Sequence, residues 1–189
     1  MASFGARLPR FAPIKEGTED QTPEYDKSVL IGRLIKADAT PNFASGKLYA
    51  DDQLAESVDE FVNATIAMET DDITDKVASV IYGATVKNKE VRYNSDDTAP
   101  FGGLTYIKVL MRKGKKIFKS YYFPKVKAVL GSDSAQTKSD NITFGTSQTT
   151  FTVFQNNDGD WRFTHEFEKE AEAKAWCKEK LACKGKASG

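Results

Sequence analysis

Three pairs of adjacent carboxylates are the residues whose types and spacing could support acid–base or metal chemistry: Asp51-Asp52, Asp71-Asp72 and Asp96-Asp97. Neighbouring carboxylates can act as a general base or hold a hard cation. Asp71-Asp72 equally suits the first turn of a helix, where acids favour the unpaired backbone N–H groups. The other two pairs stand in sequence that is typical of loops. We therefore expect no catalytic residue, no metal site and no enzyme.

The chain has one histidine, His165, and two cysteines, Cys177 and Cys183. In a helix, a rise of about 1.5 Å per residue would separate the two cysteine Cα atoms by roughly 9 Å, which is too far for a disulfide. A zinc site made from these three residues would lack the close ligand pairs of structural zinc sites. No nucleophile-elbow pattern accompanies His165. The sequence predicts free thiols in a reducing compartment and no cofactor.

The composition favours one soluble domain rather than a nucleic-acid binder or a membrane protein. The 189 residues include 27 Lys+Arg and 27 Asp+Glu, so the net charge is zero, whereas nucleic-acid binders usually carry a positive excess. Hydrophobic residues make up 40% of the chain, which is enough for a packed core. No apolar run approaches the roughly 20 residues that cross a bilayer, and residues 1–10 lack the apolar stretch of a secretory signal.

The zero net charge conceals two segregated segments. Residues 51–75 contain nine acids and no base, and residues 98–132 contain eight bases and no acid. The segments could be neighbouring strands or separately solvated faces of one molecule. Alternatively, the acidic surface of one copy meets the basic surface of the next, since complementary charge selects partner and register. Contacts between unlike surfaces close into rings or propagate as filaments. The candidate subunit-interface residues are Asp51, Asp52, Glu56, Asp59, Glu60, Lys108, Arg112, Lys113, Lys115 and Lys116.

Most of the chain alternates between apolar and polar residues, which predicts strands. Residues 1–24 contain Pro9, Pro13 and Pro23 and are expected to form an extended arm. A loop is expected around Pro41 and Gly46, and Pro124 interrupts the pattern. In the strand 59–70, Val62, Ala64, Ile66 and Met68 are expected to point inward. The predicted strands are 25–35, 47–50, 59–70, 85–87, 90–93, 106–112, 116–123, 126–130, 142–155 and 161–167.

Two helices complete the prediction. The segment 71–82 has an apolar stripe, acids in its first turn and Gly83 where a left-handed C-terminal cap is expected. The segment 168–184 is rich in Ala, Glu and Lys and has Trp176 as its apolar anchor. We therefore predict a mainly β fold, a β-sandwich or barrel over residues 25–167, with an internal helix and a C-terminal helical tail over 168–189.

Two predicted surfaces bear on partners. The segment 142–155 offers many Thr, Ser and Gln side chains, which suit a wet sheet face or a wall along which a polyanion slides. The basic hairpin 106–123 could instead bind nucleic-acid phosphates, with Tyr106 or Tyr121 stacking on bases. Its aromatic residues alternate onto both faces, which is typical of an ordinary packed sheet.

Several stretches, in this order, resemble the major tail protein, or tail tube protein, of long non-contractile-tailed bacteriophages. None is a catalytic signature, and their order and spacing over roughly residues 25–165 carry the resemblance. The stretches are residues 46–52, 54–57, 61–68, 94–103, 122–127, 137–144 and 158–161.

The resemblance implies a tail-tube-type β-sandwich with a flanking helix, six copies of which close a ring around a DNA channel. It further implies that rings stack through loops and arms, with 43–57 as a candidate stacking loop. Expected partners are other copies, tape measure and tail terminator proteins, and phage DNA that passes non-specifically. The expected location is the virion tail, after synthesis in the host cytoplasm and without membrane insertion. We also expect a channel wall that lacks the basic segment 108–127.

One alternative function is a monomeric ligand- or carbohydrate-binding β-sandwich. Trp161, Trp176 and Tyr106 would then form an exposed aromatic platform. Core packing and turn anchoring are the competing explanation, and they suit Trp161, beside its Asp-Gly turn, better than the platform does.

Overall fold

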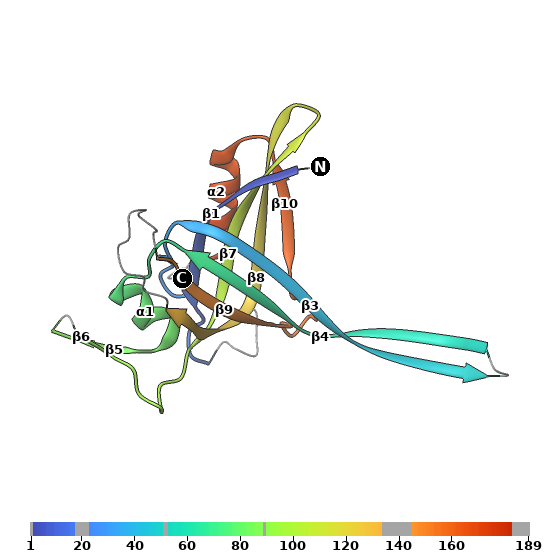
Figure 1. Ribbon diagram of the computed structural model, residues 1–189, viewed down its shortest axis with the longest axis horizontal. Coiled ribbons are helices and arrows are strands. Elements are labelled where there is room, and N and C mark those ends of the chain that lie inside the picture. Colours follow the sequence, from blue (N-terminus) through green and yellow to red (C-terminus); the bar gives the residue numbers. More distant parts are fainter. Residues whose placement is uncertain (1, 18–22, 51–52, 89, 134–144, 183–189) are drawn as a thin grey trace, which may run out of the picture.

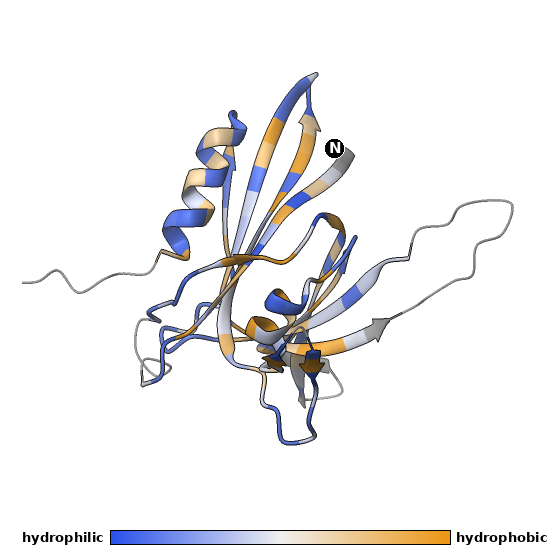
Figure 2. Ribbon diagram, turned by 90° about the vertical axis from the view of Figure 1, so that its left-hand side faces the viewer, coloured by the Kyte–Doolittle hydropathy of each residue, from blue (hydrophilic) through white to orange (hydrophobic). Residues whose placement is uncertain are grey.

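The computed structural model describes residues 2–17, 23–50, 53–88, 90–133 and 145–182 (Figure 1). The fold is mainly β, with two helices. Apolar and polar residues alternate along the strands (Figure 2). The elements are β1 (Ala2–Pro13), β2 (Val29–Leu30), β3 (Leu34–Ala50), β4 (Gln53–Thr70), α1 (Asp75–Tyr82), β5 (Thr85–Lys87), β6 (Glu90–Arg92), β7 (Phe101–Arg112), β8 (Lys115–Asp133), β9 (Ser147–Phe154), β10 (Phe163–Phe167) and α2 (Glu170–Lys180).

The main sheet is antiparallel and has the strand order β2-β1-β7-β8-β9-β4-β3, with β10 also paired to β8. β8 changes partner along its length: residues 118–122 pair with β10, and residues 125–133 pair with β9. Pro124 lies at this change of partner, where a residue without an N–H group is tolerated. The expected interruption is therefore a change of partner within one continuous strand.

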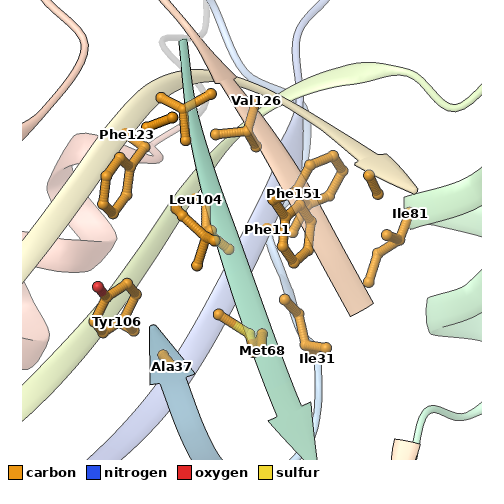
Figure 3. Packing of buried hydrophobic residues seen from close by; sticks show 14 of the residues in the cluster. Phe11, Ile31, Ala37, Met68, Ile81, Leu104, Tyr106, Phe123, Val126 and Phe151 are labelled. Atoms are coloured by element: carbon orange, nitrogen blue, oxygen red, sulfur yellow. The ribbon is translucent and has the colours of Figure 1, made fainter. Parts of the chain in front are cut away.

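The core lies between the two halves of this folded sheet (Figure 3). Phe11 of β1 and Phe151 of β9 are fully buried, with ring centroids 6.0 Å apart. Leu104 and Tyr106 of β7 and Met68 of β4 complete the same cluster. Residues far apart in the sequence thus form one core, which confirms the prediction of a mainly β fold.

The expected N-terminal arm is wrong for residues 2–13, which form β1 between β2 and β7. Phe11 and Ala12 are fully buried, so this strand belongs to the core. Pro9 lies at an irregularity in the ladder between Arg7 and Arg10, where its carbonyl accepts a hydrogen bond from the Ile31 N–H group (3.0 Å). Prolines at bulges and strand ends do not prevent a strand from forming.

Two further boundaries differ from the prediction. The predicted strand 25–35 is largely irregular: only Val29–Leu30 and the beginning of β3 are strand. The loop expected at Pro41 and Gly46 is strand, because β3 continues through both residues to Ala50. β3 is the last strand of the sheet order, and an edge strand tolerates proline.

The inward pattern of β4 is confirmed for Ala64, Ile66 and Met68, which are buried. The prediction is wrong for Val62, which is 56% exposed. Val62 is the extra residue at a register shift where Asn42 pairs with Asn63 and Phe43 with Phe61. A bulge of this kind turns the side chains before it onto a different face.

Both helices are present, with adjusted bounds. α1 begins after Thr74 rather than at Asp71, and its predicted cap Gly83 has the left-handed conformation (φ 74°). Asp71 instead accepts a hydrogen bond from the Arg33 N–H group (2.7 Å). α2 packs against the sheet through Ala173 and Cys177, which cluster with Ile107. In the described part of the chain, neither helix has the length and apolar character needed to cross a membrane.

Candidate self-association surfaces

The β3–β4 hairpin extends far beyond the body of the molecule (Figure 1). β9 pairs with β4 only over residues 64–70, so residues 42–50 and 53–63, which we call the extended hairpin, have no third strand among the described residues. Phe43, Val58 and Val62 are each more than half exposed on it. An isolated two-stranded hairpin is marginally stable in water, and clustered exposed apolar side chains mark interaction sites. The extended hairpin is therefore the first candidate surface.

An aromatic stack fixes the base of the extended hairpin. The Phe61 ring stacks on Trp161 with centroids 4.5 Å apart and meets the Phe43 ring edge-on at 5.9 Å. The Arg162 guanidinium lies over the Trp161 ring, 4.5 Å from the centroid of that ring. Gln155 also donates a hydrogen bond to the Phe61 carbonyl (3.3 Å). The segment between β9 and β10 thus sets the direction in which the hairpin leaves the body.

The acidic candidates lie on or near this hairpin. Asp59 is opposite Ser45 and Glu60 is opposite Ala44, and both acids are exposed. Glu56 is placed on β4 by its backbone, and Asp51 and Asp52 lie outside the described residues.

Two further acids of the acidic segment have local roles. Glu69 accepts a hydrogen bond from the Thr146 hydroxyl (2.6 Å), and Asp71 forms an ion pair with Arg33 (3.6 Å). Among the described acidic candidates, Asp59 and Glu60 are thus the two whose side chains lie exposed on the extended hairpin.

The basic candidates gather at the end of the β7–β8 hairpin, which turns at Lys113 and Gly114. Both residues have positive φ (48° and 77°), as a two-residue hairpin turn requires. On one face, Lys108 lies opposite Lys119 and Arg112 opposite Lys115. We call this surface the basic face; it comprises Lys108, Leu110, Arg112, Lys115, Ile117, Lys119 and Tyr121.

One acid of β10 partly compensates the basic face. Glu166 pairs with Arg112 (3.1 Å) and with Lys119 (3.6 Å). Hydrogen bonding from Arg112 is the main reason that the pKa of Glu166 lies below its ordinary value. α2 lies on the opposite face of the same strands, where it packs on Ile107 and Phe118.

The two charged segments are not neighbouring strands. β4 pairs with β3 and β9, whereas the basic end of β7–β8 pairs with β1 and β10. Figure 1 shows the β7–β8 turn and the extended hairpin on different sides of the molecule. Two interpretations from the sequence remain, namely separately solvated faces and contacts between copies.

A third surface carries neutral hydroxyl groups. Thr152 of β9 is in register with Thr65 of β4, which is in register with Thr40 of β3. Thr150 lies beside Ala67 in the next row. We call this the hydroxyl face. Thr149 points to the other side, where its hydroxyl lies 2.5 Å from that of Tyr82.

Two lysines adjoin the hydroxyl face. Lys127 of β8 pairs with Thr152, and its Nζ atom lies 5.5 Å from the Phe101 ring centroid. Lys125 contacts the same ring at 5.0 Å. The basic segment is therefore divided: residues 108–119 lie toward the β7–β8 turn, and Lys125 and Lys127 border the hydroxyl face.

The described residues that were considered for chemistry take part in local structural contacts. Asp97 accepts a hydrogen bond from the Asn94 N–H group (2.7 Å) within a turn, and His165 is exposed with its ring against Phe167 (4.2 Å). Cys177 is buried, and burial raises the pKa of its thiol. Within the described ranges, no group of three His, Cys, Asp or Glu residues could hold a metal. Cys183 lies outside these ranges.

The aromatic platform of the alternative function is not assembled. Tyr106 is fully buried, which contradicts its expected exposure. Trp161 belongs to the aromatic stack, and Trp176 of α2 packs against Phe167 of β10 (6.3 Å).

No family model matches this chain, and no curated protein is significantly similar to it. The functional assignment therefore depends on the sequence resemblance and on the geometry of these surfaces. The resemblance implied a stacking loop over residues 43–57, but sequence reasoning did not single out the exposed side chains of Phe43 and Val58 or the stacking of Phe61 on Trp161. The signal for Val58 and Phe61 was the presence of large apolar residues within a strongly acidic segment.

Proposed function

We propose that this chain is a structural protein whose copies form hexameric rings that stack into the tail tube of a long non-contractile-tailed bacteriophage. The tube would conduct DNA into the host. The extended hairpin is the observation that carries the proposal, because its exposed apolar side chains and unpaired strand edges would be buried and hydrogen-bonded in contact with a partner. The number of copies in a ring, and the tape measure and tail terminator partners, come from the resemblance alone.

The edge of the sheet supports association of identical copies. β3 ends the strand order, and its 17 residues present one edge for hydrogen bonding, in which Pro41 lacks an N–H group. Such an edge is a template for pairing with another chain, and closure into a ring removes free edges. Sheet extension across subunits is therefore the contact that we propose within a ring.

The hydroxyl face supports a conduit rather than a nucleic-acid binding protein. The side chains of Thr40, Thr65, Thr150 and Thr152 carry no charge that could hold phosphates. Further along the same face, Asp38 pairs with Ala67 and Lys36 with Glu69, so acids accompany the base there. We propose this face as the channel wall. We expected the whole segment 108–127 to lie away from the channel wall. This expectation is now limited to residues 108–119, because Lys125 and Lys127 border the hydroxyl face and would lie at the rim of the wall.

The decisive experiment is electron microscopy of the purified chain over a range of concentrations, together with light scattering for its mass. We expect rings with a central opening and, at higher concentration, tubes. Val62→Ser should weaken assembly, because Val62 is exposed on the extended hairpin. Val86→Ser is the matched control, since Val86 is 42% exposed on β5, away from this hairpin. A chain that stays monomeric at every concentration would contradict the proposal and favour the ligand-binding alternative.

A further inference from the structure

We infer that the extended hairpin of one copy docks on the basic face of a second copy. This inference rests on the proposed function for the identity of the partner, and it goes further by assigning the two surfaces to each other. Each molecule then carries a donor surface, the extended hairpin that docks, and an acceptor surface, the basic face that receives it. Such a head-to-tail contact closes into a ring or continues indefinitely.

The donor surface combines acids with apolar side chains on both faces of the extended hairpin. Strand alternation places Asp59 on the same face as Phe61 and Phe43, and Glu60 on the same face as Val58. Phe43 and Val58 are 54% and 62% exposed. Whichever face of the hairpin meets a partner, it presents one carboxylate next to an apolar side chain.

The acceptor surface has an excess of positive charge that its own strands do not balance. Lys108 and Lys119 are directly opposite each other, and like charges in this position are destabilising. Both amino groups lie near the Tyr121 ring, at 5.6 Å and 5.9 Å from its centroid. Glu166 pairs with Lys119 and Arg112, which leaves the lysine pair with more positive than negative charge around it. An acidic partner would relieve this repulsion.

The basic face also has an apolar part that suits the hairpin better than a phosphate backbone. Leu110 and Ile117 pair with each other on this face, and both are only half-buried. Together with the Tyr121 ring they can pack against Phe43 or Val58 while the charges meet beside them. Desolvated apolar contact with flanking charge pairs is the usual anatomy of a specific protein interface. This combination favours a second copy over DNA.

The test uses three charge-reversed forms of the full chain, compared by sedimentation velocity at low salt. The hairpin-reversed form carries Asp59→Lys and Glu60→Lys. The face-reversed form carries Lys108→Glu and Lys115→Glu, which pair favourably with Lys119 and Arg112 across the strands and so preserve the fold. We expect each form alone to lose at least about tenfold in self-association, and the form with all four changes to recover most of it.

A matched control separates the basic face from net charge. Lys113→Glu with Lys116→Glu changes the charge by the same amount, in the turn and on the opposite face of β8. Self-association of this control should stay close to that of the unaltered chain. The inference is overturned if the control loses as much as the face-reversed form, or if the four changes together give no recovery.

Two outcomes separate this inference from the proposed function. Rings with a channel that form equally well in the face-reversed variant would reject the docking contact and leave the tube proposal standing. Chains that associate through these charges but never enclose a channel would support the contact and reject the tube. Fluorescence anisotropy with a short DNA duplex tests DNA as the alternative partner of the basic face. If the face-reversed form loses duplex binding while its self-association is unchanged, the face binds nucleic acid and the inference is overturned.

Discussion

The hydroxyl groups of the buried tyrosines differ in whether they form hydrogen bonds. The Tyr25 hydroxyl lies 2.6 Å from that of Tyr122 and donates a hydrogen bond to the Pro124 carbonyl (2.7 Å). The Tyr106 hydroxyl is buried without a hydrogen-bond partner among the described residues. A buried polar group stabilises a fold only when it is paired. The two positions should therefore respond oppositely to loss of the hydroxyl.

Tyr25→Phe should lower the free energy of unfolding by about 1–2 kcal/mol, because the buried Pro124 carbonyl loses its donor. Tyr106→Phe should leave it unchanged or raise it, since it removes an unpaired hydroxyl. Urea denaturation of the two variants checks both values. An equal loss in both variants would mean that the Tyr106 hydroxyl is paired after all.

The same burial predicts alkaline sensitivity. Burial is the main reason that the pKa of Tyr25, Tyr82, Tyr106 and Tyr122 lies above the ordinary 10.0. Below pH 10 these groups are neutral in both states. Above it, the unfolded chain loses phenol protons that the folded chain retains, so stability falls as pH rises.

Tyr106→Phe should make this alkaline decline shallower. Each protected phenol contributes at most about 1.4 kcal/mol per pH unit above its unfolded pKa. The difference between the urea midpoints of the unaltered chain and the variant should therefore be constant below pH 10 and should grow as the pH rises above it. Parallel curves throughout would show that Tyr106 ionises equally in both states.

At the scale of elements, the aromatic stack and the α2 contacts are separate anchors. Trp161 holds the extended hairpin through Phe61, and Trp176 lies against Tyr122 (6.4 Å) with the Lys180 amino group 5.6 Å from its ring. Each tryptophan thus connects a different element to the sheet.

Trp161→Ala should increase amide exchange in residues 57–63 and leave α2 protected, at a cost of about 1–3 kcal/mol in the free energy of unfolding. Trp176→Ala, the matched control, should expose α2 and spare the hairpin. Hydrogen exchange followed by mass spectrometry resolves the two segments. Increased exchange in both segments with either variant would contradict independent anchoring.

An element could be predicted from the sequence when the interactions that determine it are local in the chain. The turn at Gly114 and the helix cap at Gly83 were predictable because glycine marks local backbone conformation. β1 was missed because its prolines suggested an arm, whereas the packing of Phe11 on Phe151 decides its place. β3 was cut short because only its edge position makes Pro41 acceptable. Local patterns do not carry such long-range causes.

For the whole molecule, the sequence identified the charged residues but not their relation. Whether Asp59 and Lys108 lie side by side depends on strand order, and in the sheet β8 and β9 separate β4, which carries Asp59, from β7, which carries Lys108. The extended hairpin itself was not predictable, because its length arises from β9 ending its pairing at Ala64.

Self-association should weaken with salt if these charges direct it. Raising the ionic strength from about 0.1 M to about 1 M shortens the screening length from roughly 10 Å to roughly 3 Å. We expect the associated fraction, measured by sedimentation velocity, to fall over this range. Association that strengthens with salt would instead assign the contact to Phe43, Val58 and Val62 alone.

Because β8 pairs with β7, β9 and β10, a tension applied between the extended hairpin and the β7–β8 turn would run through β4, β9 and β8 in succession. Such a force shears neighbouring strands along their length instead of breaking the hydrogen bonds between them one at a time. Many bonds must then yield together, so the molecule should resist stretching along this line better than across it.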